Sequence, residues 1–144
     1  EAVVVQKHQI ISAHVGDSRT QVIKNGELIR ITRDHSLVQE LVDAGEITAD
    51  EAEKHPNKNI ITRSLGQPTD IDVDTLTLEI DADDIIIMSS DGLTNMVPAE
   101  AIIETVDNDQ DVTSQAQPLV SLANTNGGLD NITVILVKFD KGDL

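Results

Sequence analysis

The dipeptide Asn25-Gly26 constrains the fold of this chain more than any other feature of its sequence. Residues 19–24 before it and 27–32 after it alternate between apolar and polar side chains, which is typical of strands with one buried face. A type I′ turn needs a positive φ at both central positions, and Asn followed by Gly accepts that conformation readily. The sequence therefore predicts an antiparallel β-hairpin here.

The other elements are predicted from periodicity and from helix caps. Strands are expected at 2–6, 9–15, 71–80, 85–89 and 132–138. Helices are expected at 37–44, at 48–55, at 99–106 after Pro98, and from Pro118 to Asn126. The run 85–89 is apolar on both faces, so we expect it to lie centrally in a sheet. Strands and hairpins with helices grouped between them predict an α+β fold with mostly antiparallel sheets.

The stretch 36–66 interrupts this series of strands. Ser36 is placed to cap a first short helix, and Thr48-Ala49-Asp50-Glu51 matches a capping box at the start of a second. The stretch is poor in large apolar residues, and segments of that kind come from the low-stability end of a structure. We therefore expect 36–66 to form a small, semi-independent helical flap.

The charge balance narrows the possible functions. The 144 residues include 10 Lys+Arg against 26 Asp+Glu, a net charge of −16. Such a field repels nucleic-acid phosphates and anionic lipid and concentrates divalent cations, so we expect no nucleic acid partner. No apolar stretch approaches the ~20 residues that a membrane span needs, so we expect no membrane insertion. The absence of cysteine suits a cytoplasmic location and leaves no thiolate metal site.

Three aspartates lie at the ends of strand-like runs. Asp17 follows one run, Asp91 follows the run 85–89, and Asp130 opens the last run. Carboxylates on strand ends can converge at one edge of a sheet, and such a cluster needs positive charge to be stable. Hard oxygen ligands favour magnesium or manganese. Each aspartate alone could be ordinary turn chemistry; the three together predict a metal site for hydrolysis.

Other polar residues are better explained by structure. Asp34-His35-Ser36 contains the residue types of a catalytic triad, but adjacent residues cannot form its relay geometry. The four histidines have no pairwise zinc spacing. Arg19 could meet a phosphate, but beside so many carboxylates we expect it to form a salt bridge.

Four motifs occur in order along nearly the whole chain. They are Val15-Gly16-Asp17-Ser18-Arg19, Thr32-Arg33-Asp34-His35-Ser36, Ser90-Asp91-Gly92-Leu93 and Gly127-Gly128-Leu129-Asp130-Asn131-Ile132-Thr133. Together they closely resemble the metal-dependent serine/threonine protein phosphatases of the type 2C class. Within the flap, Leu41-Val42-Asp43-Ala44-Gly45-Glu46-Ile47-Thr48 and His55-Pro56 are similar to the bacterial branch.

The resemblance implies a fold, a cofactor and a reaction. The fold would be part of an antiparallel β-sandwich flanked by helices, with 36–66 as the flap. Asp91 and Asp130 would hold the first of two manganese or magnesium ions, and Asp17 would help Asp91 to hold a third, weaker ion. The ions would activate a water for in-line attack on phosphoserine or phosphothreonine in proteins.

One departure from the family is large. The phosphate-binding Arg, the acid of the second metal and the bridging Asp-Gly motif that the family carries in its N-terminal third do not occur before Asp17. We therefore expect residues 1–144 to be a single phosphatase-like domain lacking its N-terminal part, with little activity alone. A catalytically inactive interaction or regulatory domain, and an acidic divalent-cation-binding module, stay open as alternatives.

The resemblance also implies partners. Phosphorylated proteins would be substrates, including a bacterial serine/threonine kinase and its targets. The missing N-terminal part or another copy of the chain would pair with strands 2–6 and 132–137, which would have lost sheet neighbours.

Overall fold

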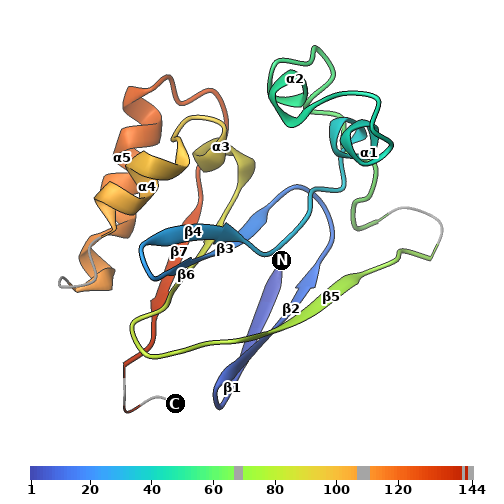
Figure 1. The fold of residues 1–144 in the computed structure, drawn as a ribbon. Coiled ribbons are helices and arrows are strands. Elements are labelled where there is room, and N and C mark those ends of the chain that lie inside the picture. Colours follow the sequence, from blue (N-terminus) through green and yellow to red (C-terminus); the bar gives the residue numbers. More distant parts are fainter. Residues whose placement is uncertain (67–69, 107–110, 141, 143–144) are drawn as a thin grey trace.

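Seven strands form two antiparallel sheets in the computed structural model, which describes residues 1–66, 70–106, 111–140 and 142 (Figure 1). The first sheet has the order β1-β2-β5 and the second the order β4-β3-β6-β7. The strands are β1 (Ala2–Gln6), β2 (Gln9–His14), β3 (Arg19–Lys24), β4 (Glu27–Arg30), β5 (Asp74–Glu79), β6 (Ile85–Ser89) and β7 (Val134–Lys138). Every pairing is antiparallel, so the predicted α+β class is confirmed.

The two sheets pack face to face. Ile10 of β2, Val22 of β3 and Ile86 of β6 meet in one buried cluster. Ile80 and Phe139 complete this cluster. Because its members come from both sheets, the sheets form the expected sandwich with an almost entirely aliphatic centre.

Helices cover the other face of the four-stranded sheet. Their bounds are α3 (Asp91–Thr94), α4 (Ala99–Thr105) and α5 (Ala116–Thr125), with the 3-10 helix η1 (Val112–Ser114) leading into α5. Figure 1 shows α3, α4 and α5 grouped beside this sheet. Ile85 and Ile87 pack against them, so β6 is buried on both faces as its sequence predicts. None of the helices in the described ranges is long and apolar enough to span a membrane.

The predicted turn between β3 and β4 is present. Asn25 has a φ of 53° and Gly26 a φ of 79°, which confirms the type I′ hairpin between β3 and β4. Lys7 also takes a positive φ of 53°, where β1 turns back into β2.

The flap contains the helices α1 (Leu37–Asp43) and α2 (Ala49–Glu53). Ser36 accepts a hydrogen bond from the backbone of Gln39, and Thr48 forms the predicted capping box with Glu51. Both caps are therefore confirmed. Val38 is the buried residue of these two helices, and Figure 1 shows both helices standing away from the sheets.

Three predicted starts lie two or three residues from the observed ones. The strand expected at 71–80 begins at Asp74, and the last strand begins at Val134 rather than at residue 132. The last strand starts later because the N–H of Thr133 donates to the side-chain oxygen of Ser90 at 3.0 Å rather than to a backbone carbonyl of β6. The helix expected to start at Pro118 starts at Ala116, which places the proline in the first turn, where a helix does not need its N–H.

Candidate metal centre and adjoining cleft

The pairing of β3 with β6 brings Asp17 and Asp91 to the same end of the four-stranded sheet. Arg19 lies opposite Ser89 in this antiparallel ladder. Asp17 lies two residues before Arg19, and Asp91 lies two residues after Ser89. Antiparallel strands run in opposite directions, so Asp17 and Asp91 both lie at the same end of the sheet.

The turn that carries Asp17 is held by a histidine. Gly16 has a φ of 115°, a conformation that a residue with a side chain rarely adopts. The N–H of Gly16 donates to Nδ1 of His35 at 3.1 Å, and the N–H of His35 donates to the carbonyl of Gly16 at 2.8 Å. The motif Thr32-Arg33-Asp34-His35-Ser36 thus positions the motif that contains Asp17.

The start of α3 is fixed against the loop that carries Asp130. Ser90 Oγ donates to the carbonyl of Asn131 at 2.8 Å and accepts from the N–H of Thr133 at 3.0 Å. A Cβ on Gly92 would lie 2.4 Å from the same Asn131 oxygen. Glycine is therefore required for the approach of α3 to this loop, and the approach brings Asp91 toward Asp130.

The electrostatics show that Asp91 is affected by the charges of the other two aspartates. Burial raises the pKa of Asp91, and the negative charges of Asp17 and then Asp130 raise it further. The opposing effects come from the backbone N–H of Gly92 and the charge of Arg19. A set of hard oxygen donors whose like charges repel one another fits a divalent cation in its chemistry.

The same donors do not make up a complete metal site. Within the ranges that the structure describes, no group of three or more His, Cys, Asp or Glu side chains is arranged to hold a metal ion. The prediction that Asp17, Asp91 and Asp130 converge as ligands therefore stays a prediction.

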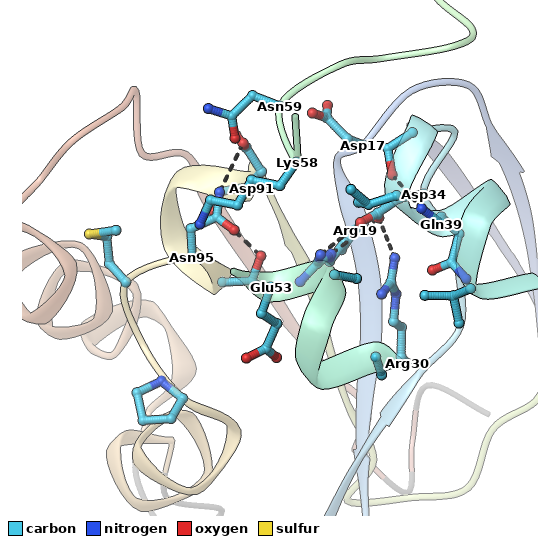
Figure 2. Close-up of a pocket in the computed structure, with 18 of the residues that line it drawn as sticks. Asp17, Arg19, Arg30, Asp34, Gln39, Glu53, Lys58, Asn59, Asp91 and Asn95 are labelled. Carbon is cyan, nitrogen blue, oxygen red and sulfur yellow. Dashed lines mark hydrogen bonds and ion pairs between the residues drawn. The ribbon is translucent and has the colours of Figure 1, made fainter. Parts of the chain in front are cut away.

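A cleft of about 500 Å³ adjoins these carboxylates (Figure 2). Its walls come from the flap, from the β3–β4 hairpin and from α3 with the segment that follows it. Asp17 and Asp91 line it together with the basic side chains of Arg19, Arg30 and Lys58. The flap thus lies directly across the cleft from the start of α3.

Asp34 joins the two arginines of this cleft. Its Oδ2 accepts from Arg19 Nη2 at 2.7 Å, and its Oδ1 accepts from Arg19 Nε at 3.1 Å. Arg30 Nη2 also binds Asp34 Oδ1. The predicted salt bridge of Arg19 is confirmed. Sequence reasoning missed the roles of Arg30 and Asp34, although Asp34 also follows a strand-like run, the signal used for the other aspartates.

The buried histidines belong to a polar network between the sheets. His14 is 2% exposed, and its Nδ1 lies 2.6 Å from Glu1 Oε2. Glu1 Oε1 also accepts hydrogen bonds from Ser12 of β2 and Thr20 of β3. The ring of His35 lies 4.7 Å from that of His14. These contacts explain the histidines as structural groups, in agreement with their lack of zinc spacing.

The sequence and the fold are similar to those of bacterial protein phosphatases. The family model described as protein phosphatase 2C matches residues 2–41. Protein phosphatase PhpP of Streptococcus pneumoniae serotype 2 is 45% identical over 143 residues, which are 99% of this chain and 58% of that protein.

Two solved structures extend the similarity to the fold. The S. agalactiae serine/threonine phosphatase superposes with a TM-score of 0.92 at 44% identity, over 96% of this chain and 57% of that one. The catalytic domain of serine threonine protein phosphatase PstP, solved in complex with 2 manganese ions, superposes with a TM-score of 0.81 at 33% identity. That match covers 94% of this chain and 56% of the PstP chain. The chain therefore spans little more than half the length of the relatives it matches.

Proposed function

This chain is related to the protein phosphatase 2C family, and from that premise we propose that it supplies one side of the active site of a metal-dependent protein phosphatase. The reaction is the hydrolysis of phosphoserine and phosphothreonine in proteins. The observation that carries this proposal is the β3–β6 register, which brings Asp17 and Asp91 to one end of the sheet beside the loop of Asp130, in a chain 45% identical to a named protein phosphatase.

The proposed metal ligands are Asp17, Asp91 and Asp130. Asp91 and Asp130 hold one ion, and Asp17 shares a weaker ion with Asp91. The ions are manganese or magnesium, and the PstP structure with its 2 manganese ions supports manganese as one suitable metal. When bound, these ions activate a water for attack on a phosphoester. The chain's own contribution is to fix the carboxylates through Ser90 and His35 and to offset part of their charge with Arg19.

Residues 36–66 act as a flap beside this site. The support is that the two flap helices have Val38 as their buried residue and that the flap lines the cleft. At its base, the N–H of Leu37 donates to the carbonyl of Ile60 at 2.9 Å, and the N–H of Thr62 donates to that of His35 at 2.8 Å. Movement of the flap about this base would open and close the cleft.

The same relatives support a bacterial signalling role. The protein substrates are those phosphorylated by a bacterial serine/threonine kinase, and the reaction takes place in the cytoplasm. The named relatives are phosphatases, so they favour an enzyme over an inactive regulatory domain or a simple cation-binding module.

Phosphate release tests the proposal. The chain alone should release little phosphate from a phosphothreonine peptide, because its ligand set is incomplete in the described residues. A chimera completed with the part of the S. pneumoniae phosphatase that this chain does not match should be active with manganese. Asp91→Asn should abolish that activity, and Asp70→Asn, at an exposed position away from the cleft, should not. Full activity of the Asp91→Asn chimera would refute the assignment of the site.

A further inference from the structure

The side chains of Arg19, Arg30 and Asp34 form a cluster with more positive than negative charge. Two guanidinium groups share one carboxylate, which leaves a formal charge of +1. Arg30 also donates from Nε to the carbonyl of Thr32 at 2.8 Å. In the part of the chain that the structure describes, the Nη1 groups of both arginines make no hydrogen bond.

The excess charge is costly to the protein. Burial lowers the pKa of Arg30, and the neighbouring charge of Arg19 lowers it further, against the opposing effect of Asp34. An ion pair that only tied β3 to the following loop would need a single arginine, since Arg19 already binds both oxygens of Asp34. The second arginine is therefore unexplained by the stability of the hairpin.

The cluster faces the cleft that contains the proposed metal ligands. Arg19, Arg30 and Asp34 line it, as do Asp17 and Asp91. Arg19 lies two residues after Asp17 and opposite Ser89, which is two residues before Asp91, so it borders both carboxylates. Figure 2 shows both arginines converging on Asp34 on one side of the cleft, with Asp91 on the other. The cavity of about 500 Å³ has room for more than one side chain.

We propose that Arg19 and Arg30 form a second anion subsite that receives a negatively charged side chain flanking the phosphorylated residue of the substrate. The inference rests on the proposed function and names its substrate class, which is phosphoproteins with an acidic or a second phosphorylated residue near the target. Guanidinium groups with free Nη1 donors suit carboxylate and phosphate oxygens equally. In a chain with a net charge of −16, the two guanidinium groups give an acidic flanking residue a local binding partner beside the carboxylates of the cleft.

Binding of three phosphothreonine peptides to the full chain tests the subsite. The peptides share one sequence and differ in the flanking positions, which carry alanine, aspartate or phosphoserine. Binding is measured by titration calorimetry in the presence of a chelator. The chelator removes divalent metal, so the peptides are not hydrolysed. We expect the aspartate and phosphoserine peptides to bind about tenfold more tightly than the alanine peptide, a typical gain for charge-assisted hydrogen bonds. A preference for phosphoserine over aspartate would identify phosphate as the natural flanking group and would support the site equally.

Arg30→Gln should remove this preference. Arg19 still neutralises Asp34 in the variant, so the fold should survive, and the affinity for the alanine peptide should not change. Arg63→Gln is the matched control, because Arg63 also binds one carboxylate, that of Asp74, at 2.9 Å and does not line the cleft. A second readout uses the wild-type chain, where the Nε–Hε NMR signals of Arg19 and Arg30 should shift with the acidic peptides.

Several results would overturn the subsite. Equal affinity for the three peptides, including no measurable binding of any, rejects it, as does an equal loss of preference in Arg30→Gln and Arg63→Gln. The proposed function fails separately, if the completed chimera releases no phosphate from any of the three peptides with manganese.

Discussion

Strands β1 and β6 have similar sequences and opposite environments. Both are aliphatic on both faces, with Ala-Val-Val-Val in β1 and Ile-Ile-Ile-Met in β6. Ile86 of β6 is 1% exposed, whereas Val4 and Val5 of β1 are 60% and 47% exposed. β6 lies inside the four-stranded sheet, between the other sheet and the helices, whereas β1 is the edge of the three-stranded sheet. The apolar sequence of a strand therefore indicates that its faces should be buried. The neighbouring elements determine whether those faces are buried.

The largest effect should come from the covered strand. Ile87→Ala should lower the free energy of unfolding by about 2–5 kcal/mol, because Ile87 is 0% exposed and its loss leaves a cavity under the helices. Ile135→Ala in β7 is the control, since Ile135 is 50% exposed. Urea denaturation of both variants provides the measurement. Similar losses for the two would mean that the contrast in burial does not hold in solution.

The next effect concerns the end of β6, where the site begins. Gly92→Ala should cost about 1–3 kcal/mol, since its Cβ would lie 2.4 Å from a backbone oxygen that cannot rotate away. The cost of this steric clash is larger than the gain of up to about 1 kcal/mol that alanine brings as a better helix former. Gly142→Ala is the control, because a Cβ there meets nothing within 4 Å.

Unfolding in urea would measure the cost of Gly92→Ala, and the amide signal of Asn131 would report the displaced loop. An unchanged stability with an unchanged Asn131 signal would show that α3 and the loop are not held together.

The local elements were largely predictable from the sequence, because their signals are local. Asn25-Gly26 fixed a turn type, and Ser36 and Thr48 fixed helix starts. The placement of Asp17 and Asp91 at one end of the sheet was also accessible, since strand ends limit where a side chain can lie.

The non-local relations were not predictable in the same way. The pairing of Arg19 with Ser89 joins residues 70 positions apart, and no local pattern sets that register. Arg30 and Asp34 were missed for this reason: only the folded hairpin shows that two arginines share one carboxylate. The burial of β1 also depends on neighbours that its own sequence does not specify.

A smaller effect should come from Glu1, the residue before β1, whose carboxylate accepts hydrogen bonds from Ser12 of β2 and Thr20 of β3. Burial alone would raise the pKa of Glu1, but hydrogen bonds from His14, Thr20 and Ser12 lower it below its ordinary value. A carboxyl group with a lowered pKa stabilises the fold above its ordinary range and loses that contribution as the pH falls through the folded-state value.

Glu1→Gln should therefore cost about 1 kcal/mol at neutral pH, and the difference from wild type should close below the ordinary glutamate pKa of about 4.3. Unfolding free energies measured across this range would show it. Glu27→Gln, at an exposed position of β4, is the control. A difference that persists unchanged into acid would mean that the charge of Glu1 contributes nothing.

The smallest effect should come from Val4→Thr, on the outer face of the three-stranded sheet. Val4 lies opposite Ile11, which is 38% exposed and faces away from the buried Ile10. The replacement keeps the branched shape that strands favour, and a solvent-exposed position tolerates such a change within about 0.5 kcal/mol. Urea denaturation at several chain concentrations, with sedimentation equilibrium beside it, would measure both stability and association. A loss approaching that of Ile87→Ala, growing with concentration, would show that this face is covered by a second copy in solution, and β1 would then resemble β6 after all.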